Sequence, residues 1–384
     1  MVRKSLVFPV YFGKYTTFLW ESHHFYIKFV ANMERRRPLL GMTLEQLRQL
    51  VADEGLPRYA ASQMAQWIYG RGARSIEEMT NLSKASRERL GERYEVGHVS
   101  PAAKFVSTDG TKKYLFPTGT EGKYIETVMI PQYDDPDEVT GSRMTICVSS
   151  QVGCKMNCSF CMTGRGGFHG NLTTGEIISQ FMNIDEAGEL TNAVFMGMGE
   201  PLDNWENVSA ALEILTSDWG FGWSPKRITV STIGVLPNLK KFLDGSRCHL
   251  AVSLHNPFPE ERAALMPVQK GFDILKVVEL LRQYDFSGQR RVSFEYTMFA
   301  GVNDTKRHAD ALVRLLKGLQ CRINLIRFHT IPESSLKPSD EGTIEQFKAR
   351  LNNAGIITTL RASRGEDIMA ACGLLAGRGL EKEA

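Results

Sequence analysis

The spacing of hydrophobic residues changes twice along the chain. In residues 43–95, apolar positions recur every three or four residues, which predicts a small helical unit. In residues 103–131, apolar and polar positions alternate around turn signals at Asp109, Gly110 and Gly119, which predicts short antiparallel strands. Two small units therefore precede the main domain.

The remaining sequence alternates short apolar runs with amphipathic helical patterns. We expect strands near residues 144–149, 192–196, 227–231, 249–254, 291–298 and 322–328, and helices near residues 175–187, 205–216, 236–243, 273–284, 305–318 and 343–353. Thr173 and Glu176 form a capping box, which marks the start of the first helix. Strands that alternate with helices form parallel sheets, so six such units predict an α/β fold: a partial (β/α)6 barrel with a small helical domain and a short antiparallel β extension.

These patterns divide the chain into segments. We expect an N-terminal extension at residues 1–42, a helical accessory domain at 43–98, a β-rich connector at 99–140, the barrel at 141–362 and a C-terminal segment at 363–384. Helical patterning begins only after Met33. Residues 1–32 are therefore consistent with an upstream extension of the gene model, and we assign no function to them.

Composition adds few constraints. The formal net charge of +3 and the pI near 8.4 permit a local nucleic-acid-binding patch but do not argue for one. No apolar run approaches the roughly 18 residues of a membrane span. The aromatic stretch at residues 5–12 is not read as a signal peptide, because Pro9 and Gly13 interrupt it and no cleavage site follows. We expect a cytoplasmic protein without a membrane partner.

Three of the seven cysteines crowd into eight residues. Cys154, Cys158 and Cys161 lie at spacings of four and three, and the odd total indicates reduced, intracellular thiols rather than a disulfide framework. Thiolates are soft ligands that suit zinc or iron-sulfur clusters, and one loop can bring all three to one centre. A structural zinc site would need a fourth ligand, which His169 could supply.

The C-x3-C-x2-C spacing resembles the cluster-binding signature of radical S-adenosylmethionine (SAM) enzymes. In that family three cysteines hold three irons of a [4Fe-4S] cluster, and SAM chelates the fourth iron. The resemblance therefore implies that Cys154, Cys158 and Cys161 are the metal ligands, and that the incomplete protein ligand set is functional.

Polar residues and glycines follow the predicted strands at their carboxyl ends. In a parallel barrel, active-site residues lie in these loops. The first strand is followed by the cysteine loop, and later strand ends carry Gly199 and Glu200, Ser231, Ser253, Leu254 and His255, and His329. SAM offers an ammonium, ribose hydroxyls and an adenine to carboxylate, hydroxyl and backbone groups of this kind. The family resemblance implies that all seven of these residues, including the apolar Leu254, contact SAM.

Further motifs narrow the resemblance to the RlmN/Cfr family. They lie at residues 149–154, 197–201, 253–255 and 364–373, and the resemblance covers about residues 43–378. RlmN-type members are dual-specificity RNA methyltransferases that methylate carbon 2 of an adenine in large-subunit rRNA and of an adenine in the tRNA anticodon loop. The resemblance implies the same activity here, with rRNA and tRNA as partners.

The resemblance also assigns three catalytic residues. Cys372 corresponds to the cysteine that is itself methylated, Cys147 to its thiol partner, and Glu126 to the proton acceptor. Glu126 lies in an otherwise apolar predicted strand, where a buried carboxylate would need a partner. His329 replaces an asparagine that is common in the family, which puts the adenosine contact at that strand end in doubt.

The implied mechanism uses two SAM molecules per turnover. Carbon 2 of adenine is electrophilic, so direct transfer of a methyl cation is unfavourable. One SAM methylates Cys372, and a 5'-deoxyadenosyl radical from the second abstracts hydrogen from that methyl group. The carbon radical adds to adenine, Glu126 removes a proton, and Cys147 attacks the sulfur of Cys372, which forms a transient disulfide and releases the methylated base. Both thiols must therefore lie within bonding reach.

Two alternatives stay open. A Cfr-like enzyme would modify carbon 8 of the same rRNA adenine; the shared cysteines do not separate the two, although Val152 and the helical unit favour carbon 2. A zinc-dependent RNA-binding protein without catalysis would use the three cysteines and His169 structurally. For the methyltransferase we expect a monomer served by a flavodoxin- or ferredoxin-type electron donor.

Overall fold

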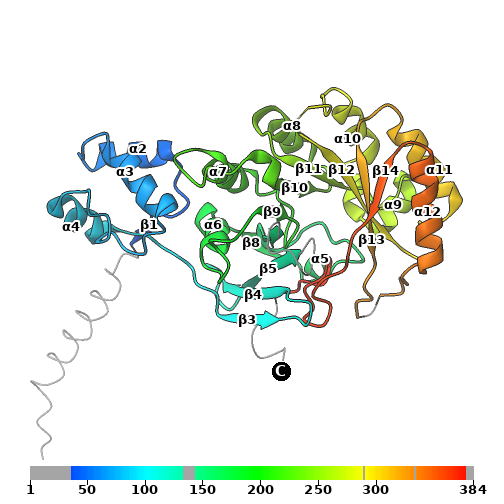
Figure 1. Cartoon of the computed structure of the whole chain (residues 1–384), viewed down its shortest axis with the longest axis horizontal. Coiled ribbons are helices and arrows are strands. Elements are labelled where there is room, and N and C mark those ends of the chain that lie inside the picture. The colour runs from blue at the N-terminus through cyan, green and yellow to red at the C-terminus, as the bar shows by residue number, and fades with distance from the viewer. Residues whose placement is uncertain (1–35, 133–142, 289, 333, 378–384) are drawn as a thin grey trace, which may run out of the picture.

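One mixed sheet runs through the main domain (Figure 1). The computed structural model describes residues 36–132, 143–288, 290–332 and 334–377. Within these ranges ten strands pair in the order β14-β13-β12-β11-β10-β9-β6-β5-β4-β3. The predicted N-terminal extension up to residue 35, the connector residues after 132 and the end of the C-terminal segment from 378 lie outside the described residues.

Seven neighbouring strands of this sheet, counted over the described residues, run parallel. They are β6 (Arg143–Cys147), β9 (Asn192–Phe195), β10 (Ile228–Thr232), β11 (His249–Ser253), β12 (Val292–Met298), β13 (Arg322–Arg327) and β14 (Ile357–Leu360). The first six are the predicted strands. Their buried apolar residues, such as Ile228, Val230 and Phe294, belong to the hydrophobic core. β14 is a seventh strand that the sequence pattern did not predict.

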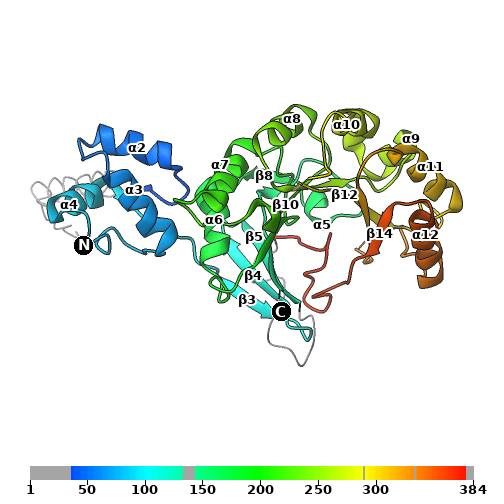
Figure 2. The same cartoon turned by 45° about the horizontal axis from the view of Figure 1, so that its top comes forward.

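Helices cover the outer face of the parallel strands (Figures 1 and 2). They are α6 (Thr174–Met182), α7 (Trp205–Thr216), α8 (Leu236–Gly245), α9 (Pro259–Leu265), α10 (Ile274–Leu281), α11 (Lys306–Leu316) and α12 (Glu341–Asn353). Each of the predicted helices is present. The capping box is confirmed, because the Thr173 hydroxyl accepts the Glu176 N–H and the Glu176 carboxylate accepts the Thr173 N–H.

The predicted connector extends the same sheet. Strands β3 (Ala103–Val106), β4 (Lys112–Pro117) and β5 (Tyr124–Gln132) pair antiparallel in succession, and β5 then pairs antiparallel with β6. This pairing places Val128 of β5 opposite Cys147 at the end of β6. The strand that carries Glu126 therefore lies directly beside the strand that carries the proposed partner thiol.

The helical unit projects from one side of the main domain (Figure 1). It comprises β1 (Arg37–Pro38), α2 (Leu44–Asp53), α3 (Ala60–Ala65), the π-helix η1 (Gln66–Gly70), α4 (Lys84–Arg93) and β2 (Tyr94–Glu95). Leu39 and Leu40, before the predicted boundary at residue 43, are buried. A Cβ on Gly41 would lie 2.3 Å from the Gly175 nitrogen, so the unit packs closely against the start of α6.

The C-terminal segment crosses the open side of the sheet. After β14 it passes back to the antiparallel strands, as Figure 2 shows. The Gly365 N–H donates to the Asp109 carboxylate at 2.9 Å, and the Ala376 N–H donates to the Glu126 carboxylate at 2.7 Å. The segment is thus fastened at both ends to the β3–β5 region. None of the helices in the described ranges is long and apolar enough to cross a bilayer.

Candidate active site

The cysteine loop is enclosed by a short hairpin of β7 (Gln151–Gly153) and β8 (Phe168–Asn171). Gly153 has a φ of 77°, and a Cβ there would lie 1.8 Å from the Gly167 carbonyl oxygen, so only glycine fits. The Cys154 N–H donates to that same carbonyl at 2.8 Å. The hairpin therefore fixes the start of the cysteine loop beside the end of β6.

The three thiols lie close enough to influence one another. Burial raises the pKa of Cys154 to about 12 and that of Cys158 well above its usual range, and the neighbouring Cys161 adds to both shifts. Such thiols gain strongly from a metal that replaces the proton. The donor set therefore fits an iron-sulfur cluster, in which each thiolate binds a separate iron.

The single-ion zinc alternative lacks support from the geometry. The His169 ring contacts the Gly166 carbonyl oxygen at 3.1 Å. In the part of the chain that the structure describes, no three His, Cys, Asp or Glu side chains surround one metal position. A Cys3His ion site would need the His169 ring to join the three thiols, which it does not do in this arrangement.

A buried arginine lies beneath the cysteine loop. Arg262 of α9 is 0% exposed and donates to the carbonyl oxygens of Ile233, Ser253 and Leu254 at 2.9–3.1 Å. Burial lowers its pKa to about 10, while the nearby Cys158 favours its charged form. Arg262 thus ties together the carboxyl ends of β10 and β11. Sequence reasoning missed it, since an arginine in an amphipathic helix is usually solvated.

The Gly199–Glu200 turn joins two strand ends. Gly199 has a φ of 97°, and a Cβ there would lie 2.5 Å from the Gln151 side chain. The Glu200 carboxylate accepts N–H bonds from Leu202 at 3.1 Å and from Ile233 at 2.9 Å. Burial raises the pKa of Glu200 to about 7, although hydrogen bonds from its neighbours oppose the shift. Glu200 therefore connects the ends of β9 and β10.

His255 is held in one protonation state and one tautomer. Its φ is 54°, and its Nδ1 accepts the Thr297 N–H at 3.0 Å. Burial, and secondly the charge of Arg262, lower the pKa of His255 to about 3, so the ring is neutral. Phe160 of the cysteine loop packs edge-on against it at 4.9 Å between ring centroids. His255 thus supports the cysteine loop.

One cavity of about 720 Å³ brings together residues of the cysteine loop, of the parallel strands and of the C-terminal segment. Four of the sequence-predicted site residues line it: Cys147, Cys161, Cys372 and His329. Its described lining does not include the other predicted residues, which are Glu126, Cys154, Cys158, Gly199, Glu200, Ser231, Ser253, Leu254 and His255. His329 contacts the Ser363 hydroxyl at 3.0 Å, which places this imidazole against the C-terminal segment.

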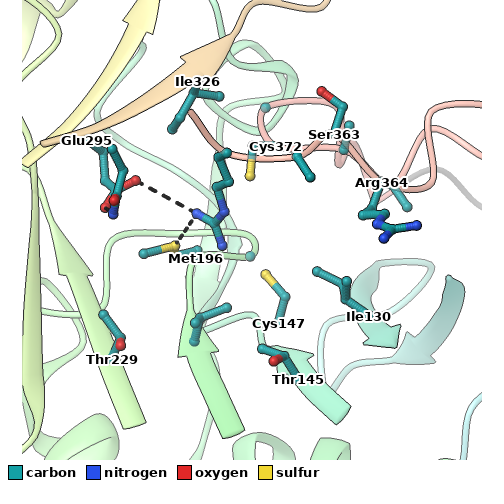
Figure 3. Close-up of a pocket in the computed structure, with 18 of the residues that line it drawn as sticks. Ile130, Thr145, Cys147, Met196, Thr229, Glu295, Ile326, Ser363, Arg364 and Cys372 are labelled. Atoms are coloured by element: carbon teal, nitrogen blue, oxygen red, sulfur yellow. Dashed lines mark hydrogen bonds and ion pairs between the residues drawn. The ribbon is translucent and has the colours of Figure 1, made fainter. Parts of the chain in front are cut away.

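Two of the cysteines outside the cluster loop, Cys147 and Cys372, face the same cavity. Figure 3 shows the sulfur atoms of Cys147 and Cys372 pointing into it from β6 and from the C-terminal segment. Cys147 is buried and Cys372 is exposed. Burial, and secondly the neighbouring Cys372, raise the pKa of Cys147 to about 12. Two cysteines that lie far apart in the sequence therefore meet at one site.

Glu126 is 1% exposed and has the partner that its position required. The Lys113 ammonium lies 3.2 Å from one carboxylate oxygen. The other oxygen accepts N–H bonds from Ala376 at 2.7 Å and from Gly377 at 3.1 Å. Because these residues follow Cys372 closely, Glu126 fixes the segment that carries this cysteine.

Two further cavity residues escaped the sequence reasoning. Arg361 follows directly after β14, and its Nη1 lies 3.8 Å from a carboxylate oxygen of Glu295 on β12. The same nitrogen donates to the Met196 sulfur at 3.1 Å, and both contacts are dashed in Figure 3. A glutamate inside an apolar strand was a usable signal for Glu295. Arg361 had no such signal, because β14 itself was not predicted.

A parallel α/β sheet whose first strand leads into a three-cysteine cluster loop defines a radical SAM enzyme. The Radical SAM superfamily model matches residues 148–313, and the Ribosomal RNA large subunit methyltransferase N-terminal domain model matches residues 38–96. A solved radical SAM methyltransferase from Sphaerobacter thermophilus superposes with a TM-score of 0.80 at 39% identity, over 89% of this chain and 100% of that one.

Named relatives identify the family. The chain is 56% identical over 349 residues, 91% of its length and 96% of the relative's, to a probable dual-specificity RNA methyltransferase RlmN of Porphyromonas gingivalis. It is 42% identical to the dual-specificity RNA methyltransferase RlmN of Marinobacter nauticus, over 88% of this chain and 92% of that one. The chain belongs to the RlmN family of radical SAM methyltransferases and is an enzyme.

Proposed function

We propose that this enzyme methylates carbon 2 of adenine in large-subunit rRNA and in the tRNA anticodon loop, through a methylated Cys372. The observation that carries the proposal is the meeting of Cys147 and Cys372 in one cavity, next to Cys161 of the cluster loop. A cavity with two thiols beside a radical source suits covalent transfer of a one-carbon group. The names of the relatives supply the substrate class.

The cofactors fit the residues described above. Cys154, Cys158 and Cys161 would hold a [4Fe-4S] cluster, and the neighbouring strand ends with Gly199, Glu200, Ser231, Ser253, Leu254, His255 and His329 would hold SAM. When bound, this pair would supply a methyl group to the Cys372 sulfur and, from a second SAM, a 5'-deoxyadenosyl radical. The remaining steps belong to the protein's own side chains.

Cys372 would first carry the methyl group as a thioether and then, after loss of one hydrogen atom, as a methylene radical. Its carbon bonds to carbon 2 of the adenine. Glu126 would then take the proton from carbon 2, and a cluster held by Cys154, Cys158 and Cys161 would take up the one electron that the adduct must also lose before the aromatic ring is restored. At that stage RNA and protein are joined by a closed-shell thioether.

Release requires the second thiol. The Cys147 thiolate attacks the Cys372 sulfur, so that a sulfur–sulfur bond forms and the sulfur–carbon bond breaks. The electron pair of the broken bond moves to the methylene carbon, which takes a proton and becomes the methyl group. The disulfide is reduced afterwards by a two-electron thiol-type reductant or by two one-electron transfers from a flavodoxin- or ferredoxin-type donor.

The position of Glu126 implies a movement in this cycle. One carboxylate oxygen already accepts two N–H bonds from Ala376 and Gly377, and the other faces Lys113. To accept a proton from the adenine, Glu126 must give up some of these contacts. We therefore propose that the C-terminal segment shifts when the base enters the cavity.

RNA binding would combine the cavity with the helical unit. The target adenine must leave its stack to reach the thiols. The half-exposed cations Arg89 and Arg93 of α4 flank the buried Glu54 on the projecting unit, where phosphates could reach them. We propose that this unit is the accessory RNA surface and that the enzyme acts as a monomer in the cytoplasm, where its RNA substrates are made.

Replacement of Cys147 tests the proposal. Cys147→Ala leaves the methylene transfer intact but removes the releasing thiol, so a covalent protein–RNA adduct should accumulate on denaturing gels. Cys248→Ala is a matched control, because Cys248 is also buried but lies outside the cavity lining. Free RNA in the Cys147→Ala reaction, with normal yields of methylated adenosine, would refute the proposed function. An 8-methyladenosine product would favour the Cfr-like alternative.

A further inference from the structure

We propose that Arg361 is the cation that allows Cys147 to act as a nucleophile in adduct release, and that Glu295 positions it. This inference rests on the proposed function, since it concerns the step in which Cys147 attacks the Cys372 sulfur. Arg361 corresponds to none of the residues that the family resemblance assigned.

The backbone of Arg361 is fixed by the sheet. Its N–H donates to the Leu325 carbonyl at 2.8 Å, which continues the β13–β14 ladder by one residue. Its own carbonyl accepts from the Arg327 guanidinium at 3.5 Å. The side chain is therefore projected into the cavity from a rigid strand end. Arg361, Cys147 and Cys372 line the same cavity. The dashed lines in Figure 3 mark the guanidinium contacts to the labelled Glu295 and Met196.

Arg361 and Cys147 each shift the pKa of the other. Burial raises the pKa of Cys147, whereas the charge of Arg361 lowers it. Conversely, negative charge on Cys372, on Glu295 and on Cys147 raises the pKa of Arg361. A cation near a thiolate in a low-dielectric cavity acts more strongly than in water. Arg361 thus offsets part of the cost of forming the Cys147 thiolate.

Glu295 holds the guanidinium without fully pairing with it. One carboxylate oxygen accepts from the Ser293 hydroxyl at 3.1 Å and from the Asn324 amide at 2.8 Å. The other oxygen is buried, has no hydrogen-bond partner and faces Arg361 at 3.8 Å. This separation exceeds hydrogen-bond distance, so the guanidinium keeps donors for a second anion. Glu295 is therefore a positioning residue, and the thiolate is the second anion.

The movement of charge during adduct release also explains why Arg361 must keep its charge. During release the negative charge moves from the Cys147 sulfur through the new disulfide to the methylene carbon and the adenine ring. A fixed cation in the cavity that both sulfur atoms line stabilises the attacking group at the start of this movement. A neutral side chain of similar shape would fill the space but would leave the thiolate unsupported.

The test compares the rate of adduct release in Arg361→Gln, Arg361→Lys and Cys147→Ala enzymes between about pH 7 and about pH 10. Adduct with end-labelled RNA is quantified on denaturing gels after a single turnover. In Arg361→Gln we expect release to slow by about tenfold throughout this range, which corresponds to one unit in the pKa of Cys147, while the release rates of both enzymes rise with pH as more thiolate forms. Arg361→Lys should release adduct far faster than Arg361→Gln.

Controls separate this inference from the proposed function. Arg322→Gln removes the same charge from the exposed start of β13, outside the cavity lining, and should release adduct as the unaltered enzyme does. Cys147→Ala should retain adduct at every pH; if it forms none, the proposed function fails. If Cys147→Ala traps adduct but Arg361→Gln releases it at the unaltered rate, or forms none because SAM no longer binds, the role given to Arg361 is wrong.

Discussion

The Glu126 carboxylate accepts the backbone N–H of Ala376 at 2.7 Å, so the proposed proton acceptor also anchors the segment that carries Cys372. This contact links acid–base chemistry to the placement of the methylated thiol. A substitution of Glu126 should therefore affect both the proton transfer and the position of the segment that carries Cys372.

Glu126→Gln keeps the shape but removes the charge that attracts the two N–H groups. We expect methyl transfer to RNA to fall by about 100-fold or more, which is typical for loss of a general base. Because charge-assisted hydrogen bonds are stronger than neutral ones, hydrogen exchange of residues 363–377 should also accelerate. Mass spectrometry measures both effects. Unchanged exchange would show that the carboxylate is not the anchor.

Cys372→Ala should abolish RNA methylation and leave the cluster intact. The methyl-accepting sulfur is lost, whereas Cys154, Cys158 and Cys161 are unaltered. Iron content and the visible absorption of the reconstituted protein check the cluster, and analysis of nucleosides checks the methylation. Retained methylation would contradict the two-thiol scheme.

The cluster assignment makes a separate prediction. Cys158→Ala removes a buried ligand and should reduce bound iron to a small fraction of that in the unaltered protein, whereas Cys321→Ala should not. Anaerobic reconstitution followed by elemental analysis gives the result. A colourless protein that contains zinc and no iron would support the non-catalytic alternative.

Gly199→Ala should destabilise the turn that carries Glu200. The backbone has a φ of 97°, and the added Cβ would lie 2.5 Å from the Gln151 side chain. We expect a loss of about 1–3 kcal/mol in the free energy of unfolding from backbone strain. Gly188→Ala is the matched control, because its Cβ would meet nothing within 4 Å. Equal thermal midpoints for the two variants would contradict the packing argument.

Local sequence patterns were sufficient to predict most of the fold. The six predicted strands each contain a short apolar run, and their helices carry clear amphipathic periods, so the alternation was visible in the sequence. β14 was missed because its four residues, with two threonines, form a strand only through pairing with β13. The antiparallel connector was recognised, but its union with the barrel sheet depends on the long-range pairing of β5 with β6.

Only part of the site could be predicted from local patterns, because the rest depends on contacts between residues far apart in the sequence. Three cysteines within eight residues signal a cluster locally, but no local pattern shows that Cys147 and Cys372 face one cavity; that expectation came from the family resemblance. Arg262 is preceded by Glu260 and Glu261 in sequence and therefore looks solvated, although it is fully buried. Arg361 depends on an unpredicted strand. Residues whose roles depend on tertiary surroundings remain hidden from pattern analysis.

The fate of the methyl hydrogens tests the central claim most directly. The enzyme would be supplied with SAM whose methyl group carries three deuterium atoms, and methylated adenosines from rRNA and tRNA would be analysed by mass spectrometry. Transfer through a Cys372 methylene predicts 2-methyladenosine with two deuterium atoms, because one is abstracted and the last hydrogen comes from solvent. A methyl group that retains three deuterium atoms would contradict the account.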